Sequence, residues 1–266
     1  MPYTFGGGGG GGALPQITLT QSQTWVPPQD GNICIHVIGG GGAGFTNTIN
    51  GAMRSGGAAG YCKKNSLAVT TSGSFTIVVG VGGYRDEGGS TAQHGGNSTV
   101  AGTGLSATLT SNGGGRAEGG AHGTGGSAAN GDVNNTGGAG NDGGGGAVGI
   151  YGTGASGTSA NIGGGQSDAS AGGINGGGLD MSGYGYIVGG DAGSSIGHYN
   201  NASLSPNGGA LSGGGGAFQL GTWDKVYVYG GNGGIGAGGG GALASSTNRA
   251  FSGKGGDGVV LIQYLP

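Results

Sequence analysis

Charged side chains are scarce in this sequence, and their scarcity excludes several classes of protein. The 266 residues include 8 Lys and Arg and 11 Asp and Glu, for a formal net charge of −3. A nucleic-acid-binding protein needs a basic stripe to neutralise phosphates, and because none is present we expect no nucleic-acid partner. Disordered chains that are poor in bulky residues usually carry a high net charge. This chain lacks that charge, so its composition is not that of an ordinary disordered protein.

Proline, cysteine and long apolar runs are also in short supply. With only 6 prolines and with its glycines in clusters, the chain does not fit the strict period of collagen. The two cysteines, Cys34 and Cys62, are too few for a disulfide framework. They are either cross-strand neighbours or, as we favour, two buried free thiols. Apolar runs such as 259–262 are too short to span a membrane, so we expect no membrane insertion. Residues 1–5 contain no basic residue, so we expect no secretion signal.

Glycine accounts for 81 of the 266 residues, several times its usual share. The glycine runs recur at irregular spacing, which excludes an exact-period repeat. A flexible linker is the simplest interpretation of such runs, but strand-like apolar segments bracket the glycine-rich region at both ends. Ordered glycine runs can form polyglycine-II rods, whose outward backbone groups must bond to neighbouring rods. The run 6–12 suits a central rod, and 208–213 suits the rim of a bundle.

Several segments have the pattern of β-strands. Residues 16–21 alternate between apolar and polar side chains, and 32–38, 75–79 and 258–264 are strongly apolar, with 58–69 as a further candidate. We therefore predict a mostly irregular, all-β protein without substantial α-helix. A small terminal β-sheet or sandwich would be formed by 1–83 together with 251–266. A bundle of polyglycine-II helices joined by variable loops would be formed by 84–250, within one compact unit.

Several short motifs resemble the glycine-rich domain that is common in bacteriophage tail-fibre proteins. They are Trp25-Val26-Pro27-Pro28, the run 39–42, Gly56-Gly57-Ala58-Ala59-Gly60-Tyr61, Gly80-Val81-Gly82-Gly83 and Gly255-Gly256-Asp257-Gly258-Val259-Val260. The chain is similar in kind to the adhesins at the long-tail-fibre tip of T-even-type phages. The resemblance implies a structural virion protein of the tail fibre or tail tip, made in the bacterial cytoplasm. Its partners would be other tail or fibre proteins and a host outer-membrane protein or surface glycan. It implies no cofactor and no catalysis.

Aromatic residues cluster in the second half of the chain, where they are candidates for receptor contact. Rigid frameworks commonly present recognition loops, and Tyr and Trp are stiff, amphipathic anchors in such loops. An equally good interpretation is that these rings cover the flank of the bundle. The candidate receptor-binding residues are Tyr184, Tyr186, Tyr199, Trp223, Tyr227 and Tyr229.

Enzymatic and metal-binding motifs are weak. His94, His122 and His198 lie in glycine-rich segments without a nucleophile elbow or a metal-binding spacing, and His36 lies in an apolar strand. The segment 137–142 begins like a calcium β-roll repeat, but the motif does not recur. The charged segments around Arg54 and around Arg116 are best interpreted as solvated turns. We expect no enzyme activity, no cofactor and no metal.

Two other functions fit the composition. One is a purely structural virion component, such as a fibre spacer or decoration protein without a receptor. The other is an ice-binding polyglycine-II protein, although irregular Tyr-bearing segments do not suit the flat, regular face that ice binding requires.

Overall fold

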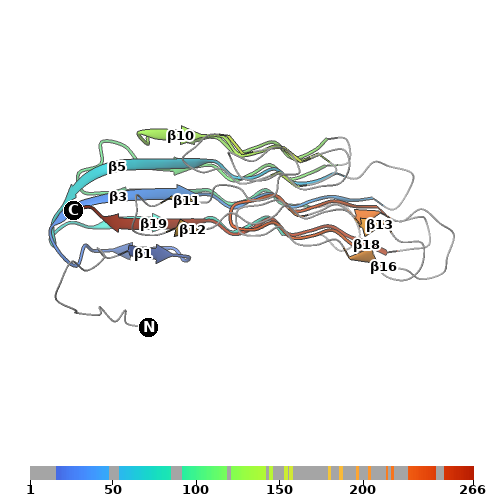
Figure 1. Ribbon diagram of the computed structural model, residues 1–266, viewed down its shortest axis with the longest axis horizontal. Coiled ribbons are helices and arrows are strands. Elements are labelled where there is room, and N and C mark those ends of the chain that lie inside the picture. Colours follow the sequence, from blue (N-terminus) through green and yellow to red (C-terminus); the bar gives the residue numbers. More distant parts are fainter. Residues whose placement is uncertain are drawn as a thin grey trace.

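A computed structural model describes residues 16–47, 54–84, 92–118, 121–141, 144–145, 153–154, 156–157, 179–180, 186–187, 196–197, 203–204, 214, 217–218, 227–243 and 249–266. In these residues the chain is all-β, with two antiparallel sheets at one end and no helix. Figure 1 shows an elongated molecule, with the larger strands at one end and extended segments running away from them. The predicted fold class is confirmed.

The first sheet has the strand order β1-β19-β3-β5-β10 and is antiparallel throughout. Its strands are β1 (Gln16–Leu19), β19 (Val259–Tyr264), β3 (Gly31–Ile38), β5 (Tyr61–Val69) and β10 (Val133–Asn135). The C-terminal strand β19 lies between β1 and β3, so the two ends of the chain close one sheet, as the apolar terminal segments predict. The described chain ends, Gln16 and Pro266, both belong to this part of the molecule.

The second sheet has the order β2-β6-β7-β8-β9 and is also antiparallel. Its strands are β2 (Gln23–Trp25), β6 (Phe75–Val78), β7 (Ser98–Gly102), β8 (Leu109–Ser111) and β9 (Ala128–Ala129). The strands β7 to β10 lie within 84–250, the range predicted to form the rod bundle, yet they belong to the two sheets. These strands show no clear pattern in the sequence because they are only two to five residues long and include Gly, Ala and Asn, which are depleted in strands.

A hydrophobic core fills the space between the two sheets. Alternate residues of β3 and β19 point into it, including Ile33, Ile35 and Ile262, all of them fully buried. Phe75 from the second sheet meets the ring of Trp25, with the ring centroids 5.5 Å apart. The core therefore comes from two-residue alternation along short strands, which explains how a chain with few bulky residues can still form one.

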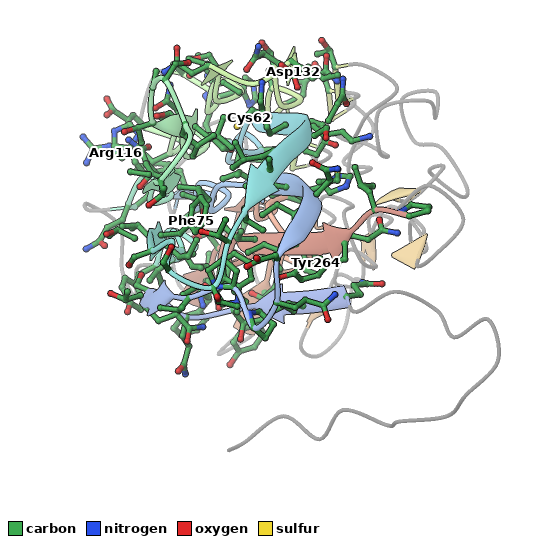
Figure 2. The ribbon with its side chains drawn as sticks, turned by 90° about the vertical axis from the view of Figure 1, so that its left-hand side faces the viewer. Cys62, Phe75, Arg116, Asp132 and Tyr264 are labelled. Carbon is green, nitrogen blue, oxygen red and sulfur yellow. The ribbon has the colours of Figure 1, made fainter. Side chains whose placement is uncertain are left out.

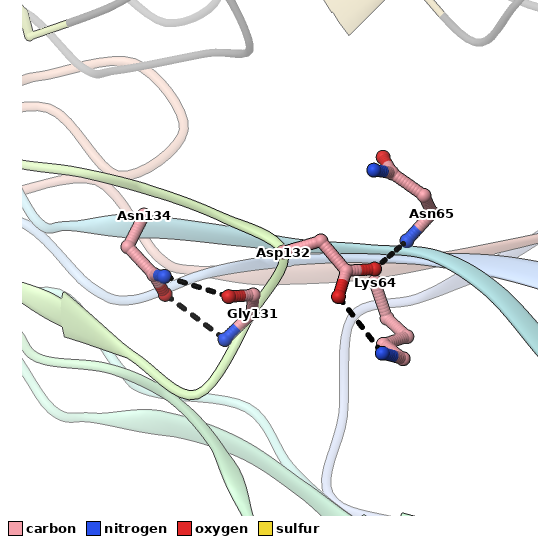
Figure 3. A network of polar contacts seen from close by, with 5 residues as sticks. All are labelled: Lys64, Asn65, Gly131, Asp132 and Asn134. Atoms are coloured by element: carbon pink, nitrogen blue, oxygen red, sulfur yellow. Dashed lines mark hydrogen bonds and ion pairs between the residues drawn. The ribbon is translucent and has the colours of Figure 1, made fainter.

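A polar clasp holds the edge strand β10 to β5. Lys64 Nζ donates to Asp132 Oδ1 at 2.8 Å, and the backbone N–H of Asn65 donates to Asp132 Oδ2 at 2.7 Å (Figure 3). Asn134 closes the adjoining turn by bonding to both the N–H and the carbonyl of Gly131. These hydrogen bonds lower the pKa of the Asp132 carboxyl below its usual value, with the Lys64 side chain as the largest cause. The clasp pins an edge strand that has no neighbour on its other side among the described strands.

Beyond the sheets, glycine-rich segments continue as rods in which the hydrogen bonds repeat every three residues. Residues three apart in one rod donate to residues three apart in the same neighbouring rod. In the rod 39–44 the pairs are Gly40 with Gly96, Ala43 with Gln93, Gly41 with Gly256 and Gly44 with Gly253. This period is that of polyglycine II, which has three residues per turn and no internal hydrogen bonds. The predicted rod conformation is therefore present in the described glycine segments.

Two rods form the centre of the bundle. The N–H groups of the rod 55–60 donate to three neighbouring segments, 136–141, 236–239 and 112–115, and its carbonyls accept from three others, 39–44, 122–127 and 144–145. The rod 39–44 is likewise hydrogen-bonded to several neighbouring segments, through both its N–H groups and its carbonyls. Ala43, Ala58 and Ala59 are fully buried in these central rods, so isolated alanines fit where their Cβ atoms find a gap. The runs 6–12 and 208–213, predicted to be a central rod and a rim rod, lie outside the described residues.

Side-chain acceptors replace a missing neighbour at the rim. The N–H of Gly113 donates to Asn97 Oδ1, and the N–H of Arg116 donates to His94 Nδ1. In both pairs the partners follow the three-residue period, so polar side chains occupy positions that a further rod would fill. A backbone donor that would otherwise lose its partner is thereby satisfied.

Short parallel strands complete the structure. Two parallel sheets have the orders β13-β15-β17-β4 and β14-β16-β18, and a separate antiparallel pair is formed by β11 and β12. Their bounds are β4 (Thr46–Asn47), β11 (Leu179–Asp180), β12 (Tyr186–Ile187), β13 (Ile196–Gly197), β14 (Ser203–Leu204), β15 (Ala217–Phe218), β16 (Tyr227–Tyr229), β17 (Ala242–Leu243) and β18 (Arg249–Phe251). From β13 to β18, successive strands alternate between the two parallel sheets, so each coil of the chain adds one strand to each sheet.

Candidate functional site

The rods lead from the sandwich to an opposite end, called here the distal end, where β4 and β13 to β18 lie. Figure 1 shows β13, β16 and β18 at this end, far from β1, β3, β5, β10 and β19. Figure 2, turned by 90°, looks onto the sandwich end, with Phe75, Cys62 and Tyr264 among its labelled side chains. Each sheet strand that continues into a rod holds one end of that rod in place. The rods thus position whatever lies at the distal end.

Three of the predicted receptor-binding residues belong to described strands. Tyr227 and Tyr229 lie in β16, which pairs in parallel with β14 and β18 at the distal end. Tyr186 lies in β12, where it is opposite Asp180 of β11 and is separate from the β16 sheet. Tyr184, Tyr199 and Trp223 lie outside the described residues. The structure therefore brings two of the six candidates into one strand.

Tyr229 stacks on an aromatic partner. Its ring lies 4.9 Å from the ring of Phe251 between centroids, with the planes 11° apart. The two residues are opposite each other in the parallel pair β16 and β18, and Phe251 is 9% exposed. Part of the Tyr229 ring therefore covers the bundle, as in the flank-packing interpretation, while the residue remains half-buried.

Two rod hairpins meet at their distal tips, and the sequence did not reveal this. The N–H of Phe45 donates to the Arg54 carbonyl at 2.8 Å and closes one tip, and an isolated bridge between Glu118 and Ala121 closes the other. Arg54 Nη1 lies 3.1 Å from His122 Nε2 across the two tips. Because a guanidinium has only donors, this imidazole nitrogen accepts, and the imidazole proton belongs on Nδ1.

The two charged segments predicted to be solvated turns differ in their surroundings. Arg116 and Glu118 form an exposed ion pair of 2.7 Å, as expected for a solvated turn. Arg54 is instead half-buried, and its Nε and the Nδ1 of His122 are buried without a hydrogen-bond partner. The only signal in the sequence was the presence of basic residues in both segments, and residue type alone could not indicate that two distant hairpins are neighbours.

A shallow groove of about 400 Å³ lies on the flank, where β1 ends beside the rods. Its lining includes Thr18, Asn232, Ile235 and the ion pair of Lys254 with Asp257, whose Nζ and Oδ1 atoms are 3.0 Å apart. Asp257 Oδ1 also accepts from the N–H of Gly82. These polar groups are thus engaged in holding rods together, and the groove is remote from the distal tips.

No group of three or more His, Cys, Asp and Glu side chains that could hold a metal ion occurs in the part of the chain that the structure describes. Cys34 and Cys62 are both buried and free, as we favoured from the sequence. Burial raises the pKa of the Cys34 thiol to about 11 and that of the Cys62 thiol to about 12. Both thiols are therefore protonated at neutral pH. No helix of the described residues has the length and apolar character to cross a membrane.

Comparison with known proteins identifies the family. The model of the glycine-rich domain matches residues 17–265, which includes both sheets and every described rod. No curated protein matches the sequence. Because the family match spans nearly the whole chain, this protein belongs to the glycine-rich domain family.

Proposed function

We propose that this protein is an adhesin of a bacteriophage tail fibre or tail tip, which binds a host outer-membrane protein or surface glycan non-covalently. The observation that carries the proposal is the bundle itself. Every described rod is bonded to its neighbours through its backbone, and the rods connect an anchoring sandwich to a separate distal end. A stiff scaffold of this kind lowers the entropy that a recognition surface loses when it binds.

The separation of the sandwich from the distal end supports this proposal. Strands β1 and β19 belong to the sandwich, so attachment of other tail or fibre proteins to the sandwich leaves the distal end free. The candidate residues in β16 lie at that free end. The proposed mechanism needs neither a cofactor nor catalysis, and under this proposal the protein is a part of the virion that is made in the bacterial cytoplasm.

Cell binding tests the proposal. Labelled protein is applied to a panel of bacterial strains, and its attachment is compared with that of Tyr199→Ala and Trp223→Ala. We expect the wild type to attach to at least one strain and to block infection of it. The variants should lose attachment while their unfolding temperatures stay within a few degrees of the wild type.

Each contrary result has a definite meaning. A protein that attaches to no strain and blocks no infection is a structural virion component rather than an adhesin. Variants that lose attachment and stability together place the aromatic rings on the flank of the bundle. Thermal hysteresis in solution would instead identify an ice-binding protein.

A further inference from the structure

A buried polar cluster lies on the face of the first sheet that points away from the sandwich core. Along β3, Ile33, Ile35 and Val37 face the core, so Cys34 and His36 face the other side. Along β19, Val260 and Ile262 face the core, so Gln263 is on the same outer face as Cys34. Despite facing away from the core, Cys34 is 2% exposed, and His36 and Gln263 are fully buried.

Cys34 and Gln263 are direct cross-strand partners. The antiparallel register of β3 and β19 pairs their Cα atoms, and such partners have Cβ atoms about 5 Å apart on one face of the sheet. The Gln side chain is long enough to bring its amide carbon to the sulfur of its partner. A thiol and a carboxamide therefore occupy neighbouring positions on one face of the sheet, away from water.

The amide of Gln263 has no hydrogen-bond partner. Both its Nε2 and its Oε1 are buried, and neither makes a hydrogen bond. A buried amide without partners costs free energy that folded proteins ordinarily avoid, so such a group calls for an explanation. The cost falls if the NH₂ group is removed, because its two donors then disappear.

His36 lies beside the Cys34 thiol, where it can accept the thiol proton. Cys34 Sγ lies 3.4 Å from His36 Nε2, and His36 Nδ1 lies 2.8 Å from the hydroxyl of Tyr61. Burial raises the pKa of Cys34 to about 11, so the thiol is neutral at rest and needs a base before it can attack. Burial raises the pKa of Tyr61 as well, so its hydroxyl stays neutral and holds the imidazole in place.

We infer that Cys34 and Gln263 form an internal thioester that covalently joins β3 to the C-terminal strand β19. The Cys34 sulfur attacks the side-chain amide carbon of Gln263, forming the S–C bond, and the C–N bond breaks. His36 Nε2 takes the thiol proton and passes it to the departing NH₂, which leaves as ammonia. The reaction is a condensation without change of oxidation state, so it needs no oxidant, reductant or co-reactant.

The fold favours this product over the separate groups. Departure of ammonia removes the two buried donors of Gln263, and exclusion of water from the outer face protects the thioester from hydrolysis. The bond would connect residues 34 and 263, so like a disulfide across a long loop it would restrict the unfolded chain. Cys62 faces the sandwich core and has no such partner role, which makes it the matched control.

Intact mass and thiol counting test the inference on the wild-type protein. The chain has two cysteines. We expect a mass lower than the sequence value by one molecule of ammonia, and one reactive thiol per denatured chain instead of two. Hydroxylamine should cleave the bond, restore the second thiol and leave a hydroxamate at Gln263 that peptide mapping locates. A full sequence mass with two free thiols would overturn the inference.

Variants identify the atoms involved. Cys34→Ala and Gln263→Met should each restore the mass expected from their own sequences, whereas Cys62→Ala should keep the loss of ammonia and show no reactive thiol. His36→Gln should leave most of the protein uncondensed, because the base is missing. Two results would exclude the thioester: persistence of the ammonia loss in Cys34→Ala, or a bond that hydroxylamine does not cleave. The second result would indicate an amide between Gln263 and a lysine such as Lys63.

Discussion

Tyr229 and Phe251 lie face to face at the distal end, with their ring centroids 4.9 Å apart. They come from β16 and β18, whose parallel register sets them directly opposite each other. The stack joins two strands at the distal end, and one of its residues, Tyr229, is a predicted receptor-binding residue. One ring can therefore serve both stability and recognition, and substitutions can separate the two contributions.

Substitution of Tyr229 separates them. Tyr229→Phe keeps the stacked ring and loses only the hydroxyl, so it should lower the free energy of unfolding much less than Tyr229→Ala does. Tyr229→Ala should destabilise the protein by about 1 kcal/mol or more, since it removes an aromatic pair and its packing. Chemical denaturation measures both variants. Equal stability of Tyr229→Ala and the wild type would show that the stack contributes nothing.

The central rods are packed so closely that a single added methyl group should not fit between them. A Cβ atom at Gly41 would lie 1.9 Å from the carbonyl oxygen of Ala237, which belongs to a rod fixed on several sides. We expect Gly41→Ala to lower the free energy of unfolding by about 3 kcal/mol or to prevent folding, because overpacking forces rods apart. The control is Gly96→Ala, whose Cβ has its nearest contact at 3.0 Å, and it should cost less. Thermal denaturation measures both variants, and equal losses of stability in Gly41→Ala and Gly96→Ala would contradict close packing at the centre of the bundle.

Amide hydrogen exchange should protect the rods as it protects strands. The N–H of Ala58 is bonded to the carbonyl of Gly138 at 2.8 Å, and Ala58 is fully buried. Its exchange should be slower than that of the exposed Ser106 by orders of magnitude, because it requires opening of the bundle. Fast exchange throughout 55–60, observed by mass spectrometry of peptides, would mean that the rods are not ordered in solution.

The Asp132 clasp predicts a loss of stability in acid. The pKa of Asp132 is lowered in the folded state, so its contribution is present above its unfolded pKa, near 4, and disappears as the pH falls through the folded pKa. Asp132→Asn should reduce stability at pH 7 by no more than about 1 kcal/mol, since the pair is partly exposed. The difference from the wild type should vanish at low pH. The free energies of unfolding are measured by urea titration at each pH. A difference between Asp132→Asn and the wild type that stays constant from pH 7 to low pH would mean that the Asp132 charge does not stabilise the fold.

The Cys62 thiol predicts a loss of stability in alkali. Burial raises its pKa to about 12, so the folded state keeps a proton that the unfolded chain releases near pH 9. Its stabilising contribution is complete below pH 9 and is lost as the pH rises toward 12, at up to about 1.4 kcal/mol per pH unit. Cys62→Ala should therefore show a shallower decline over this range than the wild type. Parallel declines of the two unfolding curves would contradict this assignment.

Patterns with a short period predicted the described fold well. The alternation at 16–21 and the apolar segments at 32–38, 75–79 and 258–264 correspond to β1, β3, β6 and β19. The strands β7 to β10 were not predicted because segments of two to five residues with small or polar side chains show little alternation. The alternation of β13 to β18 between two parallel sheets was missed for a related reason, since strands of two or three residues are too short to show a period.

The sequence by itself determined the kind of structure: glycine at this abundance, without the charge of a disordered chain, allows bare backbones to lie together as rods. Tertiary structure alone decided which rods are neighbours. Every polyglycine backbone offers the same donors and acceptors to any other, so the glycine runs carry no code for partners. The sheet strands to which they are joined supply that order, and for this reason Arg54 meets His122, and Cys34 faces Gln263, only in the folded protein.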